Sequence, residues 1–234
     1  MAVLGREFRT ICAAGIRHPP SDAFAIDGAR GRIVRTTHAM TIEAPPEAIW
    51  PWLVQMGWHR GQWYTARWVD RLLFPANEPS ADRIVPELQH LAVGDWVPDG
   101  APETGCGFVV DLLEPNQHLV LHSTEHLPPQ FAERFGAWIN WSWAFILGDL
   151  GHGRTRLVVR SRVCLGPWWV AAGYWALIIP ADFVMARQML HGVKTRAEAM
   201  ITAPGPRPRD GSTGWSAASR PGRCRHGLGA HADG

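Results

Sequence analysis

Five side chains have the chemistry that proton transfer requires: Tyr64, Asp82, Glu114, His122 and Arg160. An enzyme acting on a polyketide-like substrate would remove a proton beside a carbonyl group and stabilise the resulting enolate oxygen. Asp82 could equally form a structural ion pair with Arg83, and Arg160 could belong to a solvated stripe with Arg156 and Arg162, so the catalytic residues stay unassigned. No Ser-His-Asp order, phosphate loop or dinucleotide fingerprint stands out.

Three histidines, His118, His122 and His126, follow one another at intervals of four residues. On a helix this spacing would place metal ligands on one face. The intervening residues predict a strand instead, in which positions four apart are separated by about 13 Å. One zinc ion could not bridge them, and Cys224 and His226 do not complete a ligand set. The sequence therefore predicts no metal site, and it indicates no cofactor.

Tryptophan is abundant, with 13 residues in the chain. Aromatic side chains bury large areas and can leave one polar atom for a ligand. Trp141 and Trp143 share one face of a predicted strand and could form the floor of a pocket for a flat or lipid-like molecule. Ordinary core packing is the simpler explanation for any single tryptophan, whereas the group favours a hydrophobic pocket.

The composition limits the classes of protein. Apolar residues make up 46% of the chain and charged residues 19%, so the whole chain is not disordered. The 23 basic and 21 acidic residues leave a net charge of +2, which gives no electrostatic footprint for nucleic acid. Four cysteines without a C-x-x-C pair indicate a reducing compartment. The apolar stretch 10–16 is short for a secretory signal, so the sequence predicts a cytoplasmic protein. The small net charge predicts no nucleic-acid partner.

Strands and helices must position these residues. Alternating β-branched and polar residues predict a strand at 33–43, and Pro45 and Pro46 open a helix that Gly57 can end. A second helical pattern, with Trp68, Leu72 and Leu73 on one stripe, covers 63–74. Five short strands are then predicted at 95–97, 106–113, 118–123, 137–147 and 155–163, with turns at 114–117 and 148–153.

The residue pattern of the last strand predicts a sheet with one solvent-exposed face. Alternation places Leu157, Val159, Ser161 and Val163 on one face, which would meet a core, and Val158 on the other. Arg156, Arg160 and Arg162 fall on the opposite face, where a solvated stripe is expected.

The region before the C-terminal helix allows two interpretations. Residues 163–181 carry no charge over nineteen positions, close to the length of a membrane span. Pro167 and Pro180, however, enclose only about 20 Å of helix, against a hydrocarbon core of about 30 Å. A buried or interfacial helix is therefore favoured over a span. A long amphipathic helix is predicted to begin near Pro180, with apolar positions such as Met189 and Val193 on one stripe.

This order of elements predicts an α+β domain. A long helix laid across a curved sheet leaves space between the layers, and the small residues Gly107, Gly136 and Ala137 are compatible with a cavity. We assign residues 1–32 to an N-terminal extension and 33–202 to the domain. Residues 203–234, rich in glycine, proline and arginine, are predicted to be a disordered tail.

Several short motifs within residues 33–201 carry a family resemblance. They are IEAPPEAIW at 42–50, WLVQMG at 52–57, WY at 63–64, SADRI at 80–84, GD at 94–95, EP at 114–115, FVM at 183–185, ML at 189–190 and RAE at 196–198. With them the region resembles the START-like SRPBCC superfamily, most of all its polyketide cyclase/dehydrase and lipid transport branch. The resemblance implies a helix-grip fold with a hydrophobic ligand cavity. It implies no single activity, because the superfamily includes aromatases, cyclases, lipid-transfer proteins and plant ligand carriers.

Our leading hypothesis is a protein that binds a hydrophobic small molecule, lipid or polyketide-like, in an internal cavity. The alternatives are an aromatase, cyclase or dehydratase on the same fold, and a membrane-associated protein that uses segment 163–181, with Trp168, Trp169, Tyr174 and Trp175 at the bilayer interface. The sequence leaves the ligand and the oligomeric state open. The residues expected to contact the ligand are Trp63, Tyr64, Arg83, Trp96, Phe108, Trp141, Trp143, Phe183 and Met189.

Overall fold

A computed structural model describes residues 33–73, 75, 77–127 and 129–202 of the chain. The proposed N-terminal extension, 1–32, and tail, 203–234, lie outside the described residues. The elements are β1 (Val34–Ile42), α3 (Pro46–Val54), α4 (Arg67–Leu73), η1 (Pro86–Leu88), β2 (Trp96–Pro98), η2 (Pro102–Thr104), β3 (Gly107–Glu114), β4 (His118–Ser123), α5 (Pro129–Phe135), β5 (Trp138–Gly151), β6 (Arg154–Gly166) and α6 (Trp168–Thr202).

Six strands form one antiparallel sheet in the order β1-β6-β5-β4-β3-β2. The six strands predicted from residue alternation are confirmed. β5 and β6 are longer at their hairpin end than predicted, because a two-residue turn, His152 and Gly153, both at positive φ, joins them. Trp141 of β5 lies opposite Val163 of β6, and this register places the aromatic side chains of β5 beside the apolar side chains of β6 on the same face of the sheet.

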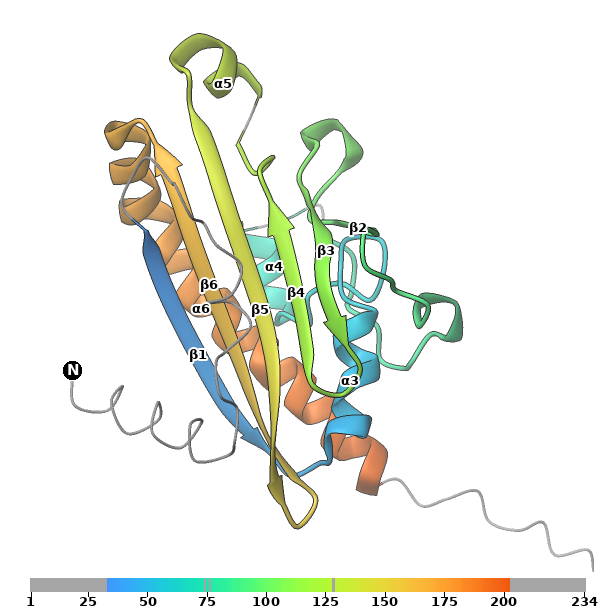
Figure 1. The fold of residues 1–234 in the computed structure, drawn as a ribbon. Helices are drawn as coiled ribbons and strands as arrows, with labels where there is room; N and C mark the ends of the chain where they lie inside the picture. Colours follow the sequence, from blue (N-terminus) through green and yellow to red (C-terminus); the bar gives the residue numbers. More distant parts are fainter. Residues whose placement is uncertain (1–32, 74, 76, 128, 203–234) are drawn as a thin grey trace, which may run out of the picture. The chain divides into compact units, whose positions relative to one another are not determined.

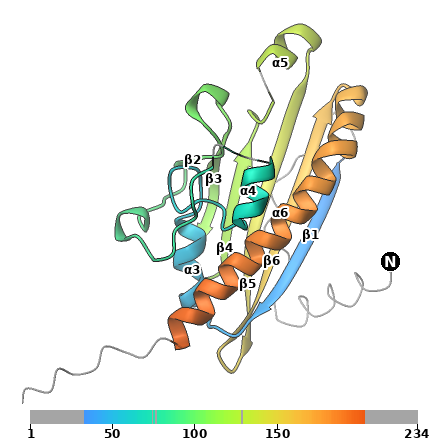
Figure 2. The same cartoon turned by 180° about the vertical axis from the view of Figure 1, so that it is seen from behind.

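The three helices α3, α4 and α6 cover the same face of the sheet, and α6 crosses it along its length (Figures 1 and 2). This is the α+β helix-grip arrangement that the sequence predicts, with a curved antiparallel sheet around a long C-terminal helix. We call the helix-covered face the inner face. It carries the apolar side of β6 together with Trp143 and Phe145 of β5, which belong to the main core cluster.

The C-terminal helix is longer than predicted. It begins at Trp168, directly after Pro167, and it passes through Pro180, where the sequence predicts a new helix to start. A proline inside a helix removes one hydrogen bond to the carbonyl four residues earlier, here that of Ala176. Ala176 is exposed, so water can solvate that carbonyl and the helix can continue.

The second half of α6, residues 186–202, lies directly on the core. Its buried side chains are Ala186, Met189, Leu190, Val193 and Ala197. A Cβ atom placed on Gly192 would overlap the backbone oxygen of Tyr64, so helix and loop touch at backbone level. The space expected between sheet and helix over 180–201 is therefore occupied by close packing in this half.

The outer face of the sheet is buried at its centre. Arg160 is 4% exposed and Arg162 is 7% exposed, so the predicted solvated arginine stripe is wrong for these two residues. Apolar side chains on the same face explain part of this burial, because they form a separate cluster beside the arginines. Its buried members are Val120, Ala144, Ile146 and Val158.

Two short helices also differ from the prediction. α4 covers Arg67–Leu73 only, whereas the sequence predicts helix from residue 63. Trp68 is 57% exposed and Leu72 is 71% exposed, so these two residues of the predicted apolar stripe do not face the core. Tyr64, at a φ of 56°, belongs to the irregular loop before α4. α5, between β4 and β5, was not predicted.

Candidate functional site

Five of the nine predicted ligand contacts are buried side by side in the main core. They are Trp63, Tyr64, Phe108, Trp143 and Met189, each at most 8% exposed. The structure thus brings together residues from the loop before α4, from β3, from β5 and from α6. Sequence reasoning found these residues because they are aromatic or lie on the apolar stripe of the helix.

The other four predicted contacts lie apart from this group or at its edge. Trp141 is partly buried and packs against two hydrophobic clusters. Arg83 is exposed, Trp96 is 44% exposed and its ring lies over Gly107 of the neighbouring strand, and Phe183 is 56% exposed. Gly107 therefore accommodates a tryptophan ring rather than widening a cavity.

The aromatic side chains of the inner face form a continuous array. The ring centroids of Trp63 and Trp143 are 5.1 Å apart, and those of Phe108 and Trp141 are also 5.1 Å apart. Trp141 and Trp143 stack at 5.8 Å. These distances are typical of favourable aromatic pairs, so the array forms one continuous apolar surface.

Tyr64 has a structural role within this array. Its hydroxyl donates a hydrogen bond to the carbonyl oxygen of Trp52 at 2.9 Å, and the Arg196 guanidinium lies 4.8 Å from its ring centroid. Burial raises the pKa of the Tyr64 hydroxyl well above its ordinary value. The phenol therefore stays neutral and its proton is already committed to a backbone acceptor.

The remaining acid and base candidates do not converge on the aromatic array. His122 Nε2 donates a hydrogen bond to Oδ1 of Asn140 at 2.9 Å, on the outer face of the sheet. Glu114 lies 3.6 Å from His118, and Asp82 is exposed. No group of three or more possible metal ligands occurs among the described residues.

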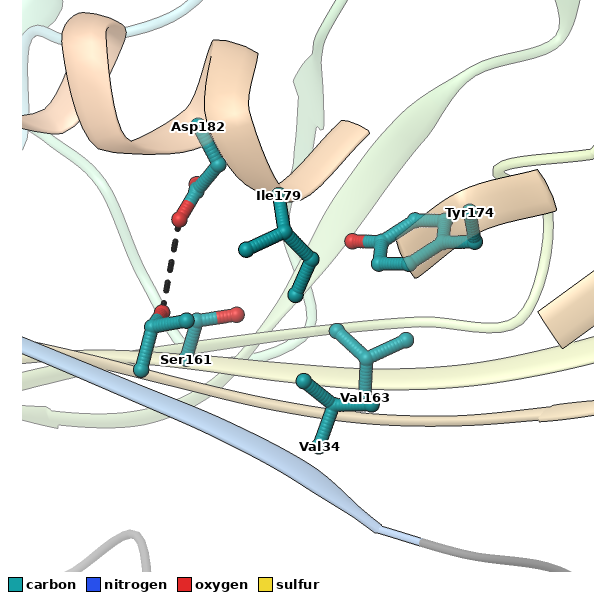
Figure 3. Close-up of a pocket in the computed structure, with 7 residues that line it drawn as sticks. Val34, Ser161, Val163, Tyr174, Ile179 and Asp182 are labelled. Atoms are coloured by element: carbon teal, nitrogen blue, oxygen red, sulfur yellow. Dashed lines mark hydrogen bonds between the residues drawn. The ribbon is translucent and has the colours of Figure 1, made fainter. Parts of the chain in front are cut away.

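A pocket lies between the sheet and the first half of α6, residues 168–185 (Figure 3). Its lining residues are Val34, Thr36, Ser161, Val163, Tyr174, Ile179 and Asp182. The open space is about that of one water molecule, well below the roughly 300 Å³ at which small-molecule pockets begin. In its present form the pocket is a narrow gap.

Polar and apolar groups are separated within this pocket. The Thr36 hydroxyl donates to Asp182 at 3.3 Å, marked by the dashed line in Figure 3, and His38 lies 3.8 Å from the same carboxylate. Burial, and then the charge of Asp182, raise the pKa of the Tyr174 hydroxyl, which keeps it neutral. Val163 contributes an apolar wall, so the gap has one polar end and one apolar end.

Trp141 connects this pocket to the aromatic array. Its indole Nε1 donates to the Ser161 hydroxyl, which lines the pocket, at 2.8 Å. Its ring faces Phe108 and Trp143 on the other side. The sequence pointed to Trp141 but not to Ser161, Thr36 or Asp182, because short polar residues on alternating strand positions give no signal of a shared site.

The fold and the site together define an α+β helix-grip protein with an aromatic inner sheet face. No protein-family model and no curated protein matches the chain. Protein MLL2253 of Mesorhizobium loti is similar in structure, with 20% identity over 68% of this chain and 97% of its own and a TM-score of 0.37. Norcoclaurine synthase of Thalictrum flavum, as a point mutant with a transition-state analogue, shows 12% identity over 74% and 98% and a TM-score of 0.44. Similarities this weak say nothing of ligand or reaction here.

Proposed function

We propose that this protein binds an apolar small molecule, lipid or polyketide-like, between the inner face of the sheet and the first half of α6. The observation that carries the proposal is the pocket formed by β1, β6 and this half of the helix. Val34, Val163 and Ile179 give it apolar walls, while Asp182 offers a polar group at one end. Pockets for small molecules combine these features, an apolar lining with few polar groups that orient the ligand.

The ligand must widen this narrow gap, and the helix above it can move. Val170 is the sole buried residue of the first half of α6, whereas five residues of the second half are buried. Segments with few buried apolar contacts open at low free-energy cost. An apolar ligand would gain about 25 cal/mol per Å² of surface removed from water, which favours outward movement of this half.

A fluorescent apolar probe, the uncharged N-phenyl-1-naphthylamine, tests this site. Ile179 lines the pocket and Ile178 beside it is 44% exposed, so Ile179→Trp and Ile178→Trp form a matched pair on one helix. We expect Ile179→Trp to fill the pocket and weaken probe binding at least about tenfold, a loss of about 1.4 kcal/mol. Ile178→Trp should bind like the wild type. Equal affinities in both variants, or no binding to the wild type, would refute the proposal.

Native mass spectrometry identifies the ligand itself. Protein expressed in its original host should carry a co-purifying apolar molecule that organic extraction removes. Protein that is persistently empty would count against ligand binding in the cell.

A second candidate function, contact with a membrane surface, rests on a different observation. Apolar side chains gather at one end of the molecule, on α5 and the first half of α6. The exposed members are Phe131, Phe135, Trp168, Trp169, Trp175, Leu177 and Ile178. The rings of Phe135 and Trp169 are 5.1 Å apart, so the two helices present one surface. We call it the aromatic tip.

The aromatic tip has the composition that membrane interfaces favour. Tryptophan is enriched at the boundary between headgroups and hydrocarbon, and Trp168 is 80% exposed. No charged side chain occurs between Trp168 and Ala181. By length and composition α6 could even cross a bilayer, with a mean hydropathy of 1.5 over an 18-residue window. Its second half packs on the sheet, however, so we propose peripheral attachment of a cytoplasmic protein.

Liposome flotation tests the aromatic tip. The variant Trp168→Ser, Trp169→Ser should float less than the wild type on vesicles of phosphatidylcholine with an anionic lipid. Trp68 and Trp96 are exposed tryptophans on other elements, so Trp68→Ser, Trp96→Ser is the matched control and should float like the wild type. Equal flotation of all three proteins would reject this contact.

A further inference from the structure

Three polar side chains form a hydrogen-bonded chain beside the aromatic array. Ser123 is the last residue of β4, His126 follows three residues later, and Asp99 comes directly after β2. The Ser123 Oγ atom lies 2.7 Å from Nδ1 of His126, and the His126 Nε2 atom lies 3.0 Å from Oδ2 of Asp99. An imidazole thus connects a hydroxyl to a carboxylate, as in hydrolases with an activated serine.

The arrangement fixes the direction of the hydrogen bonds. Asp99 as a carboxylate only accepts, so Nε2 of a neutral His126 carries the proton and donates it to Asp99. The lone pair of Nδ1 then faces Ser123, whose hydroxyl donates to it. The backbone N–H of Glu125 donates to the same Ser123 oxygen at 3.2 Å. Serine therefore has a base positioned to take its proton.

Aromatic neighbours hold the imidazole in this orientation. The His126 ring centroid is 4.4 Å from that of Phe108 and 4.8 Å from that of Trp141. The His126 side chain is 8% exposed, and Ser123 is 4% exposed. Hydrogen bonds that are shielded from water are stronger, and a ring fixed by packing needs little reorganisation during proton transfer.

We propose that Ser123 is a nucleophile, with His126 as its general base and Asp99 as the residue that positions His126. The substrate class is a carboxylic ester or thioester with an apolar acyl group, because the rings of Phe108 and Trp141 pack against the His126 imidazole that would act as the base. Ser123 Oγ attacks the acyl carbon while its proton passes to Nδ1 of His126. His126 returns this proton to the leaving alcohol or thiol, and an acyl-serine remains.

Water completes the reaction. His126 accepts a proton from the water molecule, whose oxygen bonds to the acyl carbon, and the proton then returns to Ser123 as the carboxylic acid leaves. The proposal goes beyond ligand binding and does not depend on it. Ser123, His126 and Asp99 do not line the pocket beneath α6, although Trp141 touches both places.

A serine-directed reagent tests the nucleophile in the intact protein. We use diisopropyl fluorophosphate, a small reagent, because Ser123 is largely covered. Its phosphorus forms a bond to Ser123 Oγ, fluoride leaves, and His126 takes the proton. Peptide mass spectrometry should locate a single adduct on Ser123. No adduct, or one on another residue, overturns the proposal, whatever the behaviour of the variants.

Variants separate an activated serine from a network that merely holds the loop in place. His126→Gln should lower the labelling rate at least about 100-fold, the usual range for loss of a general base. Asp99→Asn should lower the maximal labelling rate and leave the reagent concentration at half-maximum unchanged. His122→Gln, four residues before His126, is the matched control and should label like the wild type. Melting curves check folding, and undiminished labelling of well-folded His126→Gln would refute the role of His126.

Discussion

The two halves of helix α6 share one helix but differ in their surroundings. In residues 186–202, Leu190 and Val193 are at most 3% exposed and contact the sheet core. In residues 168–185, Leu177 is 73% exposed and Trp168 is 80% exposed, although this half is the more apolar in composition. The half with fewer charged residues is therefore the half whose side chains are more exposed to solvent.

This difference shows that apolar composition does not by itself predict burial. A side chain is buried only if a complementary surface lies opposite, and the sheet together with α3 buries five residues of the second half but only Val170 of the first. Exposed apolar patches of this kind mark binding surfaces for partners or membranes. Because of this contrast, we propose that the first half of α6 takes part in ligand binding and membrane contact. The second half mainly stabilises the fold.

Leucine truncation should give the largest difference between the halves. Leu190→Ala leaves a cavity in the core and should lower the free energy of unfolding by about 3 kcal/mol. Leu177→Ala, on the same helix, should change it by less than about 0.5 kcal/mol. Urea denaturation followed by tryptophan fluorescence measures both. Similar losses in the two variants would mean that Leu177 also packs on a core.

Replacing glycine with alanine should change the stability of the protein in opposite directions in the two halves of α6. Gly192→Ala should destabilise by about 1–3 kcal/mol, because the new Cβ would overlap the Tyr64 backbone. Gly173 has no atom within 4 Å of its Cβ position, so Gly173→Ala should stabilise by up to about 1 kcal/mol through helix propensity. Thermal unfolding monitored by circular dichroism gives the sign of each. A stabilising Gly192→Ala would contradict the close approach of helix and loop.

The smallest expected effect concerns the ion pair that ties the second half to β1. Burial opposes ionisation of Glu198, but the hydrogen bonds from Lys194 Nζ, at 2.6 Å, and from the Glu43 N–H lower the pKa of its carboxyl overall. Its contribution is therefore present at neutral pH and is lost as pH falls through this lowered pKa. At pH 7, Glu198→Gln should lower the free energy of unfolding by about 0.5 kcal/mol, as is usual for exposed ion pairs. In acid, where the carboxyl of the wild type is protonated and as neutral as the amide of the variant, the two proteins should be equally stable.

Urea titrations at neutral and acidic pH measure the Glu198 effect. Glu133→Gln on α5 is the control and should follow the wild type across the same range. A Glu198→Gln deficit that persists unchanged in acid would show that packing, rather than charge, is responsible.

Much of the fold could be predicted, because alternation and turns are local signals. The period of two in β1 and β6, such as Leu157, Val159 and Ser161 on one face, is sufficient to place the strands. The start of α6 could not be predicted, because Pro180 normally ends or begins a helix and only the exposure of Ala176 makes it tolerable inside one. The burial of Arg160 and Arg162 also escaped prediction, since alternation reveals two faces but not what covers them.

The candidate site was less predictable, because it depends on contacts between distant segments. Trp63, Phe108 and Trp143 could be proposed from residue type, and the structure brings them together. His126 was considered only as a metal ligand with His118 and His122. Its contact with Asp99 joins residues 27 positions apart, and no local pattern encodes that pairing. Strand register, which places β2 and the end of β4 at one end of the sheet, supplies what the sequence pattern lacks.

The uneven anchoring of α6 also makes the helix a mechanical lever. Five of its six buried residues lie at or after Ala186, and the end at Trp168 lies about 27 Å from Ala186, at a rise of 1.5 Å per residue. A tilt of about 10° there would swing Trp168 through about 5 Å, by the same helical geometry. A small rotation beside the core would thus be amplified at the aromatic tip, and insertion of the tip into a lipid layer would pull on the gap beneath Ile179.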